Sequence, residues 1–145
     1  MFLDASAIIA IIGDEPEAGY LIAKLELTTK PIYYSSVSAY EAIVGFARKK
    51  RDAMIGDQHP IPPPLIDQAQ RIIGGFLAEL KAEEIAIGTG MHRKAIEACR
   101  TYGRAVAHPA RLNFGDCFAY ACAKTHNVPL LYKGDDFSQT DFDAA

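Results

Sequence analysis

Cysteine is scarce in this sequence, and so are long hydrophobic runs. The cysteines Cys99, Cys117 and Cys122 are odd in number and show no C-x-x-C spacing, which argues against a disulfide framework or a zinc site. We therefore expect three buried thiols in a reducing compartment. The apolar stretch 7–12 is far too short to span a bilayer, and no basic segment precedes it. We expect a cytoplasmic protein without a signal peptide or membrane contact.

Excess positive charge is also missing. The 15 lysines and arginines are outnumbered by 18 acids, so the formal net charge of −3 provides no overall attraction to nucleic acid. Contact with RNA would then depend on local basic groups, or on metal ions that offset acidic side chains. Half of the residues are hydrophobic and 23% are charged, which over 145 residues favours a single domain, 1–145.

Short apolar runs alternate with longer segments of helical period. This pattern predicts an α/β fold with a mainly parallel central sheet of four or five strands flanked by helices. The expected strands are 2–3, 32–34, 85–87 and 129–132. The expected helices are 7–12 with Ser6 as N-cap, one that starts at Pro16, 38–53, 65–80, 92–102 and 116–126. A proline-rich loop is expected at 56–64, and Gly74-Gly75 favours close approach of another backbone.

Acidic residues stand where such a fold places its ligand site. Asp4 follows the first strand, Glu41 lies one turn into the helix after the second, and Asp116 opens the helix before the last. Asp135 and Asp136 follow that last strand. Taken singly, each acid could be a helix cap or a turn residue. Ligands bind beyond the carboxyl ends of parallel strands, however, and oxygen ligands suit Mg²⁺ and Mn²⁺. The sequence therefore predicts a carboxylate metal site at that edge.

Four stretches carry a likeness to a known family. They are MFLDAS at 1–6, SAYEA at 38–42, LNFGDCFAYA at 112–121 and LLYKGDDF at 130–137. In these stretches the chain resembles PIN domains, and specifically the VapC toxins of bacterial VapBC toxin–antitoxin systems. Residues 55–81 match no motif of the family. The resemblance implies a PIN-like fold and a ribonuclease that depends on Mg²⁺ or Mn²⁺.

The resemblance also implies roles for individual residues. Asp4, Glu41 and Asp116 correspond to the core metal-binding and catalytic acids. The fourth family acid falls on Asp135, with Asp136 as the alternative, and we rank Asp135 first because it directly follows the strand and its glycine. Two further residues, Ser6 and Asn113, would orient a carboxylate or a metal-bound water, or would simply be helix N-caps.

The proposed reaction is hydrolysis of an RNA phosphodiester by a water that the metal activates. The four histidines are scattered and none has a spacing that suggests a catalytic pair. Positive charge for RNA binding is available at Arg48, Lys49, Arg51, Arg104 and Arg111. The first three of these also fit a second interpretation, in which charges near a helix C-terminus complement its dipole.

Partners and rival functions complete the expectations. The resemblance implies a VapB-like antitoxin and a homodimer, and the apolar positions of 20–27 and 65–80 form either the antitoxin surface or plain core. A catalytically silent PIN module that binds RNA or a protein partner is the main alternative. DNA as substrate is another, because the acids do not inspect the 2′-hydroxyl. A haloacid-dehalogenase-like phosphatase is disfavoured, since that family needs an aspartate where Ser6 stands.

Overall fold

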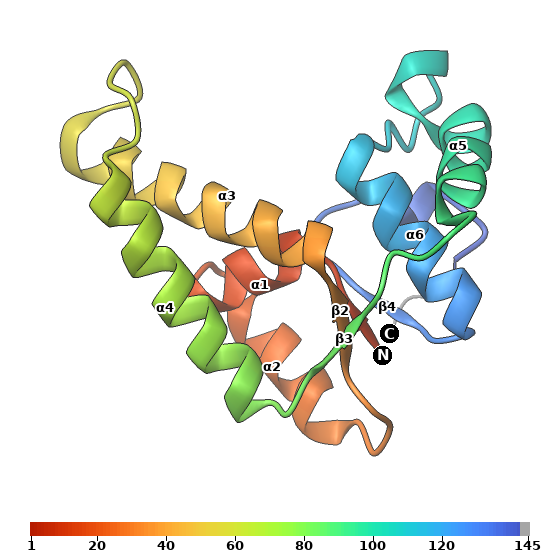
Figure 1. Ribbon diagram of the computed structural model, residues 1–145, viewed down its shortest axis with the longest axis horizontal. Coiled ribbons are helices and arrows are strands. Elements are labelled where there is room, and N and C mark those ends of the chain that lie inside the picture. Colours follow the sequence, from red (N-terminus) through yellow and green to blue (C-terminus); the bar gives the residue numbers. More distant parts are fainter. Residues whose placement is uncertain (143–145) are drawn as a thin grey trace.

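A parallel sheet of four strands runs through the centre of the molecule, in the order β3-β2-β1-β4 (Figure 1). The computed structural model describes residues 1–142, so the last three residues of the expected domain 1–145 lie outside the described residues. The strands are β1 (Phe2–Leu3), β2 (Tyr33–Ser35), β3 (Glu83–Ile85) and β4 (Leu130–Leu131). The predicted α/β class and parallel sheet are confirmed.

Helices cover both faces of this sheet. They are α1 (Ala5–Ile12), α2 (Ala18–Leu27), α3 (Ser36–Ile55), α4 (Pro63–Glu79), α5 (Met91–Tyr102) and α6 (Phe114–His126), with short 3-10 turns η1 (Arg104–Val106) and η2 (Phe137–Gln139). In Figure 1, α1 to α4 lie on one side of the strands and α5 and α6 on the other. In the part of the chain that is described, no helix has the length and apolar character that crossing a bilayer requires.

The strands are short because each needs only to separate two hydrophobic cores. Successive side chains of a strand point to opposite faces. Leu3 and Leu131 accordingly pack with α1 to α4, whereas Phe2 and Leu130 pack with α5 and α6. All four side chains are almost fully buried, which is typical of parallel sheets with helices on both faces. This two-sided burial explains why the strands appear in the sequence as short apolar runs without alternation.

Several helix boundaries differ from the sequence prediction because capping side chains set them. The first helix begins at Ala5 with Asp4 as its N-cap, so Ser6 is not the cap that we predicted. Ser35 caps α3 by accepting a hydrogen bond from Ser38 N, and the helix starts two residues earlier than predicted. The second helix starts at Ala18 instead of Pro16. The predicted loop 56–64 ends at Pro62, because Pro63 is already the first residue of α4.

Two other predictions fail for different reasons. The third strand is Glu83–Ile85 and not 85–87, because its register pairs Glu83 with Tyr33 and Ile85 with Ser35. Backbone pairing at the edge of the sheet thus prevails over the apolar run that guided the prediction. The Gly74-Gly75 pair is exposed, and an added Cβ at either position would meet nothing within 4 Å. No close backbone approach explains these glycines.

Candidate active site

Asp4 lies at the carboxyl end of β1 and is only 3% exposed. Its backbone N–H still pairs with Leu131 of the neighbouring strand β4, at 3.0 Å. Its Oδ2 accepts hydrogen bonds from Ser6 N at 2.8 Å and from Ser6 Oγ at 2.5 Å. Ser6 Oγ also accepts from Lys133 N at 3.0 Å, just after β4. Ser6 therefore holds the Asp4 carboxylate and ties it to the end of the adjacent strand.

Asp116 lies in the first turn of α6 and is 8% exposed. Asn113, the N-cap, accepts a hydrogen bond from Asp116 N through its Oδ1 at 3.1 Å. In return, Asp116 Oδ2 accepts from Asn113 N at 2.7 Å. This reciprocal pair is a capping box, and it leaves the Asp116 side chain with one fixed orientation. Asn113 therefore both caps the helix and orients the carboxylate, so the two roles that the sequence left open coincide.

Glu41 reaches the same place from α3. A Cβ atom added to Gly115 would lie 1.7 Å from Glu41 Oε2 and 2.1 Å from its Cδ. The carboxylate of Glu41 thus rests against the backbone of α6 beside Asp116, in a space that exists only because residue 115 is glycine. Sequence reasoning did not single out Gly115. The sequence did contain a signal for this role, because Gly115, which has no side chain, directly precedes Asp116.

The three carboxylates act on one another electrostatically. Burial raises the pKa of Glu41 to about 7, and the charges of Asp4 and Asp116 add to that rise. Burial also raises the pKa of Asp116 to about 6, and Asp4 contributes in the same direction. The pKa of Asp4 is raised mainly by burial, against the hydrogen bonds from Ser6. Like charges that hinder each other's ionisation must lie close together. The structure thus brings the three acids into one cluster.

The structure favours Asp136 over Asp135 as the fourth acid. The charge of Asp136 raises the pKa of both Asp4 and Asp116. The charge of Asp135 instead acts on Tyr132, and Asp135 borders a separate hollow near α2. The chain turns after β4, and Phe137 is buried there as an anchor. The electrostatic effect thus favours Asp136, and the choice between Asp135 and Asp136 stays a prediction.

The donor chemistry of the cluster fits a hard divalent cation. Within residues 1–142, no three acidic, histidine or cysteine side chains are positioned closely enough to ligate one ion as they stand. The cluster nevertheless offers only carboxylate oxygens, which Mg²⁺ and Mn²⁺ prefer. Burial raises the pKa of Glu41 and Asp116, and the charges of neighbouring acids add to that rise, so a cation would offset both the burial and the repulsion. Asp4, Glu41, Asp116 and Asp136 are the residues that would hold it.

The basic residues chosen from the sequence fall into different surroundings. Arg104 lies near the acids, since its charge lowers the pKa of Asp116 against the other effects. Lys49 instead forms an ion pair with Glu15 at 2.5 Å. Arg51 binds Asp52 and donates to the carbonyl oxygen of His59, so it holds the loop after α3. The structure therefore assigns structural contacts to Lys49 and Arg51, whereas Arg48 and Arg111 are exposed.

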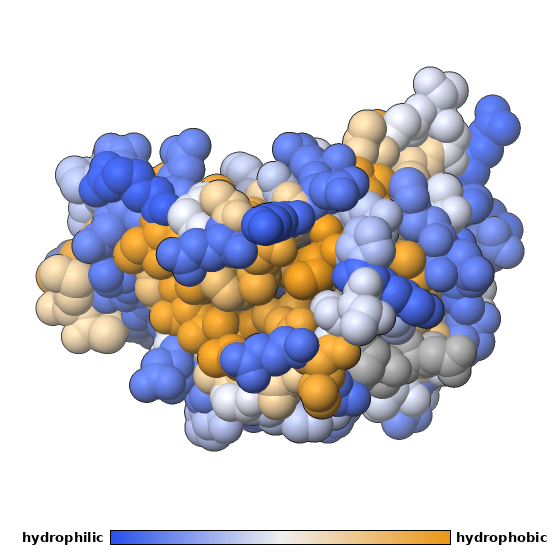
Figure 2. Space-filling model, turned by 90° about the horizontal axis from the view of Figure 1, so that it is seen from below, coloured by the Kyte–Doolittle hydropathy of each residue, from blue (hydrophilic) through white to orange (hydrophobic). Residues whose placement is uncertain are grey.

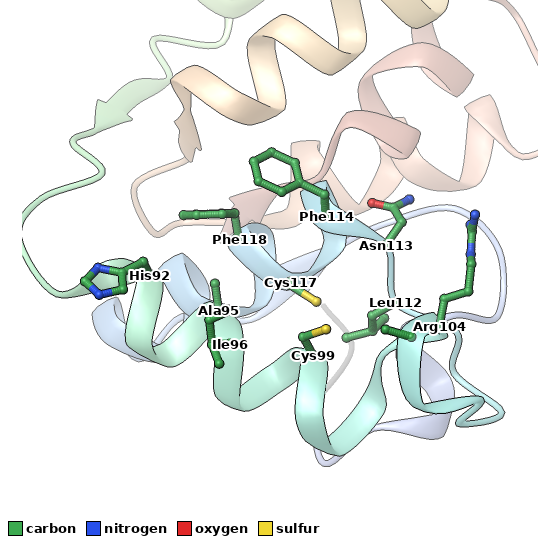
Figure 3. Close-up of a pocket in the computed structure, with 11 residues that line it drawn as sticks. His92, Ala95, Ile96, Cys99, Arg104, Leu112, Asn113, Phe114, Cys117 and Phe118 are labelled. Carbon is green, nitrogen blue, oxygen red and sulfur yellow. The ribbon is translucent and has the colours of Figure 1, made fainter.

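An apolar hollow opens beside the cluster, between α5 and α6 (Figure 3). Cys99 from α5 and Cys117 from α6 point toward each other inside it. Burial raises the pKa of Cys117 to about 12 and of Cys122 to about 11, so both thiols stay protonated at neutral pH. All three cysteines are free thiols, but Cys99 is only half-buried and not fully enclosed as we expected.

A protein-family model described as PIN domain matches residues 1–143. The chain belongs to the PIN-domain family. Among its relatives is a VapC ribonuclease of Rhizobium meliloti (strain 1021), 37% identical over 140 residues that cover 97% of both chains. Ribonuclease VapC42 of Mycobacterium tuberculosis is 32% identical over 141 residues, which cover 97% of this chain and 95% of the relative. The predicted VapC-like character is therefore confirmed, and the phosphatase alternative is excluded.

A solved structure supports this PIN domain's fold. The crystal structure of Mycobacterium tuberculosis VapC20, a toxin that cleaves the sarcin–ricin loop, superimposes with a TM-score of 0.68 and covers 99% of this chain and 97% of its own. Sequence identity to VapC20 is only 14%, so this likeness concerns the fold alone. The six-helix, four-strand arrangement of the described residues is thus the VapC variant of the PIN fold.

Proposed function

We propose that this PIN domain is an endoribonuclease that depends on Mg²⁺ or Mn²⁺ and acts as the toxin of a toxin–antitoxin pair. One observation carries the proposal. Three buried or half-buried carboxylates from separate elements, Asp4, Glu41 and Asp116, meet in one cluster and oppose each other's ionisation. Burying charges in this way is costly unless a partner compensates them. A structural role gives no reason for that cost, whereas a cation site does.

Each acid has a distinct part in the proposed reaction. When bound, the cation would lower the pKa of a water molecule and offset charge on the phosphodiester. Asp4 and Asp116 have fixed orientations because Ser6 and Asn113 hold them, so they bind without first losing side-chain freedom. Burial raises the pKa of Glu41 to about 7, so Glu41 would give up its proton when the cation binds and would complete the set of ligands.

RNA is the favoured substrate because the relatives at 37% and 32% identity are named ribonucleases. The carboxylates themselves bind phosphate oxygens and do not distinguish RNA from DNA. Arg104, whose charge reaches Asp116, is the basic residue best placed to contact the backbone of the substrate. The particular RNA would be selected by surfaces around the acids.

We further propose that a VapB-like antitoxin holds the protein inactive in the cytoplasm, and that the toxin is a homodimer. Figure 2 shows a broad hydrophobic area on the face where α2 and the end of α4 lie. The exposed hydrophobic side chains of these helices include Tyr20, Ile22, Leu27 and Ile72, with Leu27 81% exposed. The opposite sides of the same helices are core, as Leu21 and Ile73 show. Both roles that the sequence allowed for these apolar stripes are therefore available.

Cleavage of a generic RNA by the purified protein tests the proposal. We expect cleavage with Mg²⁺ or Mn²⁺, none with a chelator, and none in Asp4→Asn with either metal. Circular dichroism and thermal unfolding would show that Asp4→Asn remains folded. Met54→Ala, an exposed residue on α3 with no role in the proposal, serves as the control and should cleave like the parent protein. If Asp4→Asn cleaves normally, the metal-site assignment is wrong. If the folded parent binds RNA but never cleaves it, the silent-module alternative is correct.

A further inference from the structure

The apolar hollow between α5 and α6 has no part in the cleavage chemistry proposed above. Its volume is about 620 Å³. Figure 3 shows the lining side chains running from His92 and Phe118 at one end to Asn113 and Arg104 at the other, with Cys99 and Cys117 between them. A hollow of this size with few polar groups is the usual form of a site for a small organic ligand.

Two aromatic rings lie at its edge, and one of them is exposed while the other is half-buried. Phe114 is 68% exposed, although it lies in the first turn of a helix whose following residues are mostly buried. Its ring lies 5.0 Å from that of Phe118, centroid to centroid, and both project from α6. Ile96 on α5, which also lines the hollow, is 56% exposed. Exposed apolar groups that gather at one site mark a binding surface.

One end of the hollow lies next to Asp116 of the carboxylate cluster. Asn113, one of its lining residues, exchanges two hydrogen bonds with Asp116. Phe114 directly follows Asn113, and Arg104 lines the same end of the hollow. The guanidinium of Arg104 also acts on the Asp116 carboxylate. A phosphate at the acids would thus lie beside a cationic group, and the nucleotide that carries it would lie beside two aromatic rings.

We propose that this hollow receives an unstacked nucleobase of the substrate, next to the phosphodiester at the acids, with Phe114 and Phe118 stacking on the base and Arg104 contacting its phosphate. This inference rests on the proposed function and adds the base contact to it. Aromatic side chains bind single-stranded RNA by stacking, and arginine contributes to the backbone. Arg104 suits the phosphate of a nucleotide, and the two aromatic rings and the apolar lining of the hollow suit its base.

RNA explains this surface better than a segment of another protein does. A peptide that covered the apolar rings would place the Arg104 guanidinium and the nearby acids against uncharged chain. A nucleotide suits the rings, because its base is flat, and it suits the Arg104 guanidinium, because its phosphate is anionic. The cation site and Arg104 then hold neighbouring phosphate oxygens while the rings hold the base.

Tryptophan fluorescence tests the inference without relying on cleavage. The chain contains no tryptophan, so Phe118→Trp introduces a single reporter in the hollow. The probes are short homopolymeric single-stranded RNAs and a ribose–phosphate oligomer of equal length without bases, added in a chelator so that nothing is cut. We expect RNA to quench the tryptophan and the base-free oligomer to leave it unchanged. Binding of the unlabelled protein is measured in parallel by anisotropy of a dye-labelled RNA.

Variants at Phe114 separate stacking from volume. Phe114→Ala and Phe114→Leu should each weaken RNA binding about tenfold, whereas Phe114→Tyr should bind like the parent protein. None of them should change the weaker binding of the base-free oligomer. Met54→Ala, which removes a similarly exposed apolar side chain on α3, should leave both affinities unchanged. Circular dichroism confirms that each variant is folded.

The outcomes distinguish this inference from the proposed function. Equal affinity for RNA and the base-free oligomer would overturn the inference while cleavage by the parent protein stood. If Phe114→Leu loses binding of RNA but not of the base-free oligomer, the base site is upheld. If the parent protein also never cleaves RNA, the proposed nuclease function is wrong. If Phe114→Ala leaves RNA binding intact but changes the sedimentation of the protein, the hollow is a protein interface and the inference is wrong.

Discussion

Asp116 and Asn113 each satisfy a backbone N–H of the other: Asn113 N donates to Asp116 Oδ2 at 2.7 Å, and Asp116 N donates to Asn113 Oδ1 at 3.1 Å. The same two bonds start α6 and fix a carboxylate of the cluster. Helix initiation and the orientation of the acid therefore depend on one residue pair. Replacing the Asn113 side chain removes the Oδ1 acceptor and keeps the backbone donor, so it should act on the helix start directly and on the acid through that first turn.

Asn113→Ala removes the side-chain acceptor for Asp116 N but keeps the backbone N–H of residue 113, which donates to Asp116 Oδ2. We expect the free energy of unfolding to fall by about 1 kcal/mol, as for other lost N-caps. Cleavage should fall about tenfold, the lower end of effects around a metal ligand, because the uncapped first turn holds Asp116 less firmly although its bond from the backbone N–H remains. Asn113→Ser keeps an N-cap acceptor and should recover most of both. Chemical denaturation measures the free energy of unfolding, and initial rates measure cleavage. If the free energy of unfolding falls by the expected amount and cleavage does not fall, the N-cap does not help to orient Asp116.

Gly115→Ala should displace Glu41. A new Cβ would lie 1.7 Å from Glu41 Oε2, so the carboxylate must leave its place beside Asp116. We expect cleavage to fall about 100-fold or more, although alanine is the better helix former. Gly75→Ala is the matched control, because a Cβ there meets nothing within 4 Å. It should raise the free energy of unfolding by up to about 1 kcal/mol and leave cleavage unchanged.

Asp136→Asn and Asp135→Asn should differ. The charge of Asp136 acts on Asp4 and Asp116, so its loss should weaken Mg²⁺ binding and lower cleavage about tenfold or more. Asp135 acts on Tyr132 instead, and Asp135→Asn should cleave within about twofold of the parent protein. Metal titration of the cleavage rate measures both. The reverse order of effects would restore Asp135 as the fourth acid.

The sequence was sufficient for the fold class because burial on both faces of a parallel sheet leaves a local signature. Phe2-Leu3 and Leu130-Leu131 are short apolar runs and both are strands. The third strand was misplaced because Glu83, at the edge of the sheet, is fixed by backbone pairing with Tyr33 and not by its own side chain. Local patterns record which residues are buried, but they do not record hydrogen bonds to a distant strand.

The same limit applies to the site. Asp4, Glu41 and Asp116 could be selected because each follows a strand or lies near the start of a helix at the expected end of the sheet. The choice between Asp135 and Asp136 could not be made, since it depends on how the chain turns before Phe137. Gly115 was overlooked because its role is to leave room for a side chain 74 positions away. The sequence therefore predicts which acids form the cluster better than it predicts how they are arranged in space.

The stability of the metal-free protein should decrease as the pH rises from about 5.5 to 8. The folded-state pKa values of Glu41, about 7, and Asp116, about 6, lie above their unfolded values. The folded protein then binds more protons than the unfolded chain in this range, so the free energy of unfolding falls with pH. We expect a loss of roughly 1–3 kcal/mol. The lowered pKa values of Glu15 and Asp141 act below this range.

Thermal unfolding in a chelator measures this slope. Glu41→Gln should flatten it, because the variant lacks the carboxyl with the highest pKa of the cluster. Mg²⁺ should raise the melting temperature more at pH 8, where the acids are ionised, than at pH 5.5. A slope that is unchanged in Glu41→Gln would show that the acids do not share the repulsion on which the cation site rests.

Arg104 and Lys49 should contribute differently to the salt dependence of RNA binding. Arg104 faces the acids and the hollow, so Arg104→Gln should weaken binding and reduce the slope of log K against log[salt] by about one. Lys49 is paired with Glu15, and Lys49→Gln should leave that slope unchanged while lowering the free energy of unfolding by at most about 1 kcal/mol. Anisotropy titrations over a range of salt concentrations, in a chelator, give both slopes. Equal slopes in Arg104→Gln and the parent protein would show that the phosphates lie elsewhere, because a guanidinium that releases no counterions contacts no phosphate.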